Sequence, residues 1–224
     1  MVVLYDQQRD QGDLLAAAEL TTAQTVTAMV QQGGGLVAVA LTAGRIRDLG
    51  LKQIPLMREG GRRICERTPL IVSVEARAGV STGISAEDRA RTIWALADPA
   101  SAGSDLVSPG HVFPLAAADG GLLERYGRLE AATEAVRLAG LQPAATLCDV
   151  LDDDGDLAAG AGLRTLALEL GIPFLSIGAL ADSLFDELWS NPVHPVPTAA
   201  ARATGVQAGA RALPVTVLQP RSLR

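Results

Sequence analysis

The sequence predicts one α/β domain of the α+β kind, in which a mixed sheet is surrounded by helices, over residues 1–189. Short apolar runs of strand length alternate with segments of helical periodicity along this part of the chain. Several of these runs are separated by stretches too long for simple βαβ units, which favours a mixed sheet over a doubly wound parallel one. A chain of 224 residues that is 48% hydrophobic suits one domain with a sizeable core.

The first part of the chain is predicted to alternate strands with helices. Residues 1–5 form an apolar strand that ends in a polar loop, and residues 14–32 are predicted as a helix that a run of glycines stops. A continuous apolar run with the length of a strand follows at residues 36–41, and a short capped helix comes after it at 42–49. The Gly- and Arg-rich stretch at 52–68 is expected to form an irregular, mobile loop before the next strand at 69–75.

The second part continues the alternation and ends in a tail. Ser85 and Asp88 form a reduced capping box that opens a helix reaching about residue 97. Further helices are expected at residues 129–139, 163–171 and 179–189. Strands are expected between them at residues 144–151 and 173–177. Residues 190–224 are rich in proline and alanine and weakly periodic, which predicts a tail or a vestigial linker.

Composition excludes several classes of function. The net charge is −6 and no basic run is present, so binding of nucleic acid through its phosphates is not expected. Cys65 and Cys148 lie far apart and indicate two reduced, buried thiols. No apolar run approaches the roughly 18 residues of a membrane helix. The first residues lack the basic region of a signal peptide, so a cytoplasmic protein without a membrane partner is expected.

Two segments carry a specific resemblance. They are Gly79–Ile93, which reads Gly-Val-Ser-Thr-Gly-Ile-Ser-Ala-Glu-Asp-Arg-Ala-Arg-Thr-Ile, and Ser108–Leu115, which reads Ser-Pro-Gly-His-Val-Phe-Pro-Leu. In this order and at this spacing the chain resembles the 3,4-dihydroxy-2-butanone-4-phosphate synthase family. These lyases of riboflavin biosynthesis convert ribulose 5-phosphate into a four-carbon ketone phosphate and formate. The resemblance extends from about Val2 to Ile177 and implies a homodimer with active sites at the subunit interface, a phosphorylated small-molecule substrate and magnesium.

The loop after the first strand departs from the family pattern. The family reads Asp-x-x-Arg-Glu-Asn-Glu-Gly-Asp, in which the Glu after the Arg binds magnesium and the last Asp contacts the substrate. Asp13 matches that last Asp. One alignment places Asp10 at the magnesium Glu, and another places Arg9 there. Both residues are therefore candidates for substrate binding, and Thr82 in the first motif is a further one.

The second metal ligand of the family is replaced. The family pattern Arg-x-Gly-His-Thr-Glu-Ala corresponds to residues 125–131, where Arg125 keeps the position expected to bind phosphate and Arg128 stands in place of the ligand His. A guanidinium has no lone pair for a metal and repels one nearby. We therefore expect no metal cofactor, and at most a weak magnesium ion held by Asp10 and Glu130.

Two further positions match residues that are essential in the family. His111 corresponds to the His of Arg-Pro-Gly-His, and Asp149 corresponds to a Glu that follows Cys in a late strand. The shorter Asp keeps the carboxylate but loses the reach of one methylene, which matters for a general base. The resemblance thus predicts His111, Asp149 and Asp13 as catalytic residues, and Arg9, Asp10, Thr82, Arg125, Arg128 and Glu130 as substrate-binding residues.

The substitutions gather at metal- and substrate-facing positions, and this pattern leads to three hypotheses. The first is a diverged lyase that acts on a phosphosugar or a related polyhydroxy carbonyl compound, with Arg128 supplying the charge that magnesium supplies elsewhere. The second is an authentic synthase that makes 3,4-dihydroxy-2-butanone 4-phosphate and formate. The third is a non-catalytic paralogue that binds a ligand or a partner. The sequence favours the first.

Overall fold

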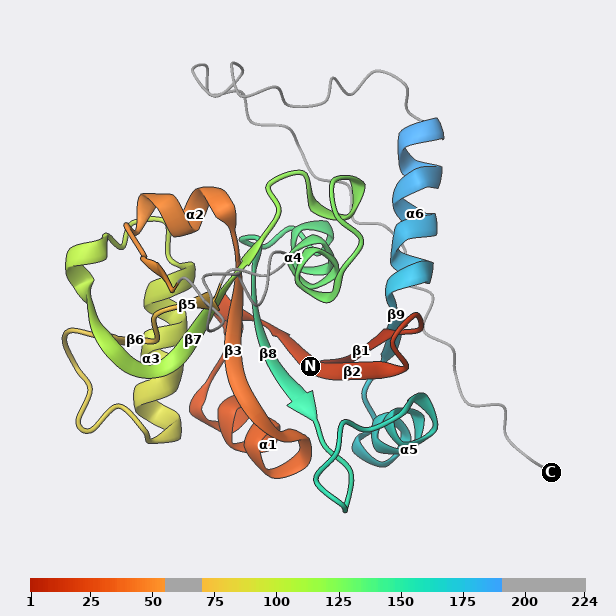
Figure 1. Cartoon of the computed structure of the whole chain (residues 1–224), viewed down its shortest axis with the longest axis horizontal. Helices are drawn as coiled ribbons and strands as arrows, with labels where there is room; N and C mark the ends of the chain where they lie inside the picture. Colours follow the sequence, from red (N-terminus) through yellow and green to blue (C-terminus); the bar gives the residue numbers. More distant parts are fainter. Residues whose placement is uncertain (55–69, 191–224) are drawn as a thin grey trace, which may run out of the picture.

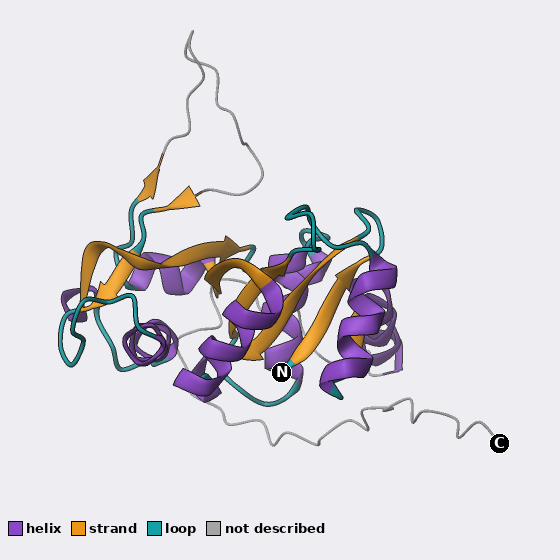
Figure 2. Ribbon diagram, turned by 90° about the horizontal axis from the view of Figure 1, so that it is seen from below, coloured by secondary structure: helices purple, strands orange, loops and turns teal. Residues whose placement is uncertain are grey.

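The computed structural model describes residues 1–54 and 70–190, which form a nine-stranded sheet with helices on both faces (Figure 1, Figure 2). The described strands are β1 (Val2–Asp6), β2 (Gln11–Ala17), β3 (Gly34–Thr42), β4 (Gln53–Ile54), β5 (Leu70–Ile71), β6 (Val74–Ala76), β7 (Leu106–Ala117), β8 (Ala144–Val150) and β9 (Phe174–Ser176). They are ordered β4-β5-β7-β3-β8-β2-β1-β9, and β6 pairs with β7. The pairs β1–β9 and β3–β7 are parallel and the others antiparallel, so the predicted mixed sheet is confirmed.

The helices begin and end where local chemistry favours it. They are α1 (Ala23–Gly33), α2 (Ala43–Asp48), α3 (Ala86–Ala97), α4 (Arg128–Leu138), α5 (Gly160–Leu170) and α6 (Ile177–Ser190). Thr22 caps α1 by accepting a hydrogen bond from the amide of Thr25, and Ser85 caps α3 in the same way from the amide of Asp88. Gly171 ends α5 in the left-handed conformation at φ 62°.

The alternation of side chains along the strands creates two cores, one on each face of the sheet. Val3 and Leu14 face a core shared with α1, α3 and α5, whereas their neighbours Leu4 and Leu15 face a core shared with α4 and α6. This is the period of two that a strand imposes. Both faces are therefore covered, and the strands read as continuous apolar runs rather than alternating ones.

The predicted helix over residues 14–32 was wrong in its first half. Gln11–Ala17 is strand β2, and only Ala23–Gly33 is helical. A tight turn after Asp6 folds β2 back on β1, and β2 also pairs with β8 on its other side. An apolar strand buried on both faces shows no alternation, so periodicity alone did not separate it from a helix.

The remaining differences lie in the middle and at the end of the chain. The Ser108–Leu115 motif belongs to the twelve-residue strand β7, although it contains proline and glycine. The strand expected at 69–75 is divided into β5 and β6. Most of the loop expected at 52–68, which includes Cys65, lies outside the described residues. So does the tail from residue 191, and the boundary at 189/190 stays a prediction.

Two other expectations can be compared with the described residues. The thiol of Cys148 is buried and free, as predicted. No helix between residues 1 and 54 or 70 and 190 has the length and apolar character needed to cross a membrane.

Leu96 provides a test of the first core. Its side chain lies at 0% exposure between α3 and the sheet, so Leu96→Ala should lower the free energy of unfolding by about 2–5 kcal/mol. Leu168→Ala, in which the same deletion is made at 76% exposure on α5, should change it by no more than about 0.5 kcal/mol. Urea titrations followed by circular dichroism measure both. Equal losses would contradict this account of the core.

Candidate active site

A polar cleft of about 830 Å³ lies where the turn after β1 meets the start of α4 and the end of β8. It brings together six of the nine residues that the sequence proposed for the site, which come from four different segments of the chain. These six are Arg9, Asp13, Arg125, Arg128, Glu130 and Asp149.

Arg128 joins the two carboxylates at the centre of the cleft. Asp13 on β2 and Asp149 on β8 are direct partners in the antiparallel register, an arrangement in which like charges repel. Arg128 is the first residue of α4, and its Nη1 donates a 2.6 Å hydrogen bond to Oδ1 of Asp13 and a second one to Oδ1 of Asp149. One guanidinium therefore bridges a pair of carboxylates that the sheet forces together.

The electrostatics of this cluster follow from burial. Burial raises the pKa of Asp13 to about 7, because the cost of desolvating the carboxylate outweighs the opposing effect of Arg128, and repulsion from Asp149 and Asp6 adds to it. Burial by itself would lower the pKa of Arg128, but Asp13 and Asp149 outweigh it and the net shift is upward. Arg128 thus stays charged, and Asp13 is placed to exchange a proton near neutral pH.

Arg125 is held in the wall of the same cleft by Glu130. Nε of Arg125 donates a 2.8 Å hydrogen bond to Oε1 of Glu130, and its Nη2 donates to the carbonyl of Ala116 at 2.9 Å. Glu130 is only 1% exposed and also accepts a 2.8 Å hydrogen bond from the amide of Ala118. Gly127 makes room for this, because a Cβ there would lie 2.7 Å from Oε2 of Glu130.

Asp10 lies apart from the other acidic residues of the site and does not line the cleft. Its Oδ1 accepts hydrogen bonds from the hydroxyl of Tyr5 at 2.8 Å and from the amide of Gly160, the first residue of α5, at 2.9 Å. The Tyr5 bond and the Gly160 amide lower the pKa of Asp10. The structure therefore does not bring Asp10 and Glu130 together as a weak magnesium site.

The donor set of the cleft does not fit a divalent ion. Asp13 and Asp149 hold Arg128, and Glu130 holds Arg125, so these three carboxylates already have a cationic partner. Over the described residues, no group of three or more His, Cys, Asp or Glu side chains is arranged to hold a metal.

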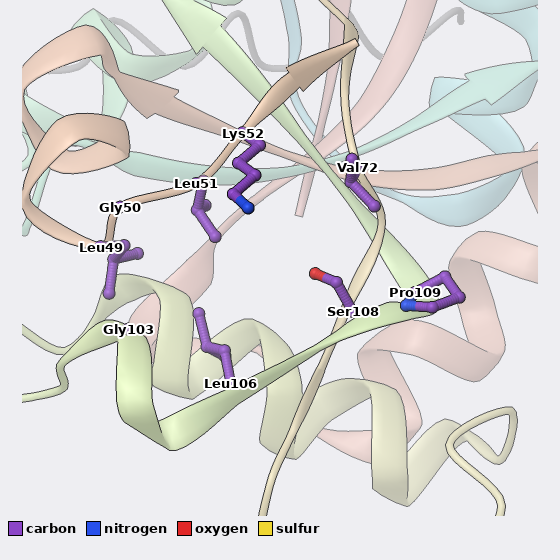
Figure 3. Close-up of a pocket in the computed structure, with 9 residues that line it drawn as sticks. All are labelled: Leu49, Gly50, Leu51, Lys52, Val72, Gly103, Leu106, Ser108 and Pro109. Atoms are coloured by element: carbon purple, nitrogen blue, oxygen red, sulfur yellow. The ribbon is translucent and has the colours of Figure 1, made fainter.

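His111 and Thr82 lie outside the cleft of their own chain. His111 is exposed on β7, and its Nδ1 contacts Oε1 of Glu75 on β6. Thr82 is exposed in the loop before α3. Ser108 and Pro109, from the same motif as His111, line a separate pocket of about 350 Å³ (Figure 3).

Sequence reasoning did not include Asp6 and Glu75, two acidic residues that pair with proposed site residues. Asp6 lines the cleft at 8% exposure and contributes to the high pKa of Asp13. The alternation of side chains along a strand could have revealed it. Asp6 lies two residues after Leu4 and so on the same face of β1, and Leu4 is paired with Asp13 on β2. Glu75 is the last residue of the strand expected at 69–75, and nothing in the sequence pairs it with His111.

Comparison with known proteins identifies the family. Residues 1–183 match the family profile described as 3,4-dihydroxy-2-butanone 4-phosphate synthase. The chain belongs to this family. The synthase of Pseudomonas syringae pv. tomato is 42% identical over 184 residues, which cover 81% of this chain and 48% of that protein. The synthase of Cupriavidus pinatubonensis is 42% identical over 182 residues, covering 80% and 79%.

Solved structures of the family have the same fold. The synthase of Candida albicans aligns with a TM-score of 0.73 and 34% identity, covering 82% of this chain and 90% of that one. A synthase solved in complex with two magnesium ions aligns with a TM-score of 0.75 and 32% identity, covering 83% and 90%. The chain spans about half the length of the first curated relatives that it matches.

The pKa of Asp13 predicts how stability depends on pH. An unfolded Asp titrates near pH 3.9, so between that value and about 7 the folded state binds the extra proton and is favoured as pH falls. This contribution is lost as pH rises through about 7. Relative to Asp13→Asn, the wild type should therefore lose free energy of unfolding between about pH 5 and about pH 8.

Urea titrations at both pH values measure the difference, and Asp153→Asn in the exposed turn after β8 is the matched control. The control should follow the wild type. If Asp13→Asn also followed it, Asp13 would not titrate near neutral pH.

Proposed function

We propose that the chain is a lyase that converts ribulose 5-phosphate into 3,4-dihydroxy-2-butanone 4-phosphate and formate, a step of riboflavin formation. The product is the one in the names of its relatives, and identities of 42% support this reading over the altered chemistry that the substitutions favoured. The altered chemistry remains a second candidate. The proposal concerns this chain alone, because the first relatives are about twice as long.

The observation that carries the proposal is the arrangement of Asp13, Arg128 and Asp149 in one polar cleft. The reaction begins with loss of the proton on the carbon next to the ketone, and the electron pair moves onto the ketone oxygen. A carboxyl group with a pKa of about 7 suits proton transfer near neutral pH, which assigns this role to Asp13. The guanidinium beside it stabilises the negative charge that develops on oxygen.

Binding of the phosphorylated substrate is assigned to the arginines of the cleft wall. Arg125 and Arg9 both line the cleft, and guanidinium groups bind phosphate oxygens through paired, charge-assisted hydrogen bonds. Glu130 fixes the orientation of Arg125 from behind. The volume of the cleft suits a small phosphorylated sugar.

Magnesium has no assigned role in this proposal. A solved relative carries two magnesium ions, yet three carboxylates of this cleft are paired with arginines, and Arg128 offers no lone pair. The fixed charge of Arg128 is proposed to act where a bound cation acts in that relative.

A homodimer is part of the same proposal. His111 and Thr82 match family site residues but do not line the cleft of their own chain. A second copy that placed its His111 at the mouth of this cleft would complete the site. Such a homodimer explains why His111 and Thr82 lie on a different part of the surface from the cleft of their own chain.

The second candidate is a lyase for a different polyhydroxy carbonyl phosphate. It is favoured by the pairing of Arg128 with both Asp13 and Asp149, which occupies the carboxylates that a metal-dependent synthase would need. This candidate keeps the proton-transfer chemistry and changes only the compound that enters the cleft.

Formate release tests the proposal directly. With ribulose 5-phosphate and the chelator EDTA present, one formate and one four-carbon ketone phosphate should appear per substrate consumed, at the rate found with magnesium. Enzymatic formate assay and ¹³C NMR measure these products. Arg128→Gln should lower kcat by about 100-fold, because it removes the charge that stabilises the oxyanion.

Arg137→Gln is the matched control, since Arg137 lies on the same helix but pairs with Glu134 at the surface. It should leave kcat unchanged. Activity that EDTA abolishes would contradict the metal-free site. Turnover of another polyhydroxy carbonyl phosphate alone would favour the second candidate, and no turnover of either would leave a non-catalytic paralogue.

A further inference from the structure

We propose that Glu75 is a positioning residue that holds His111 in one tautomer, with the proton on Nδ1 and with Nε2 as the nitrogen that meets the substrate. The inference rests on the proposed function, in which His111 contributes to a site. It concerns a contact that lies on β6 and β7, away from the Arg128 cleft.

The hydrogen bond fixes the tautomer by chemistry alone. Oε1 of Glu75 contacts Nδ1 of His111, and an ionised carboxylate can only accept. Nδ1 must therefore carry the proton, which leaves Nε2 of a neutral imidazole as the acceptor. The His111 side chain is 44% exposed and Glu75 only 16%, so the imidazole is the accessible member of the pair.

The surrounding backbone is shaped to place Glu75 under His111. Gly83 has φ 85°, and a Cβ there would lie 1.6 Å from Oε1 of Glu75. Only glycine leaves this path open to the carboxylate. The register between β6 and β7 also shifts between Val74 and Glu75, and such an irregularity re-aims a side chain.

The strand that carries His111 is held equally closely. The amide of Gly110 donates a 3.2 Å hydrogen bond to Oγ of Ser73, and a Cβ on Gly110 would lie 2.2 Å from the backbone of Val74. An exposed ion pair adds little stability by itself. The close approach of three backbone segments around one partly exposed imidazole is better explained by a need to orient it.

Imidazole ¹⁵N NMR tests the tautomer. The chain has only two histidines, His111 and His194, so His111→Asn assigns the spectrum. At about pH 8.5, where imidazoles are neutral, His111 should be the Nδ1–H tautomer in the wild type. Glu75→Ala should shift it toward Nε2–H. Glu75→Asp keeps a carboxylate that can only accept and should keep the wild-type tautomer, while Glu87→Ala on α3 should change nothing.

Kinetics with ribulose 5-phosphate supply the functional readout. Glu75→Ala should lower kcat by about 10-fold or more with little change in KM, and Glu75→Asp should recover most of the loss. An unchanged tautomer in Glu75→Ala, or a kcat equal to that of Glu87→Ala, would overturn the inference. A wild type that releases no formate would instead reject the proposed function, while the NMR result would still decide the role of Glu75.

Discussion

The ion pairs of Arg128 with Asp13 and Asp149 are the interaction on which the site depends. The antiparallel register of β2 and β8 sets the two carboxylates directly opposite each other, and Asp13 is almost fully buried. Two such charges cannot both persist without a cation or a proton. Arg128 supplies a permanent cation. Burial nevertheless raises the pKa of Asp13 to about 7, so near neutral pH both the protonated and the ionised forms of this carboxyl group are populated.

The rest of the fold serves to bring this guanidinium to that place. α4 packs in the core shared with α6, and Gly127 allows the chain to enter the helix beside Glu130. Arg128 then begins α4, a position where the helix dipole disfavours a positive charge. The two carboxylates offset this cost. The same carboxylates would have to release Arg128 before they could bind a metal ion. The Arg128 guanidinium and a metal ion therefore cannot bind these two carboxylates at the same time.

Much of the fold could be predicted, because most elements have local signals. α3 has its Ser85 cap, and β8 is a continuous apolar run, so both were placed to within a residue or two. The strand β2 failed because it is buried on both faces and its Leu- and Ala-rich run has no period. Its identity comes from pairing with β1 and β8, which is a property of the whole sheet.

The site was predictable only in part, for similar reasons. The family motifs pointed to Asp13, Arg125, Arg128 and Asp149, and all four line one cleft because each motif lies on a fixed element. The direction of Asp10 depends on the turn after β1, where the chain adopts φ 55° and the carboxylate turns to α5. The contact of His111 with Glu75 joins positions 36 residues apart, and no spacing rule reveals it.

The central claim is that a guanidinium occupies the place of a divalent cation. Anomalous diffraction from a crystal soaked in manganese tests it most directly. The account predicts electron density for the Arg128 side chain between Asp13 and Asp149 and no manganese peak there. A manganese peak bridging the two carboxylates, with Arg128 displaced from them, would contradict it.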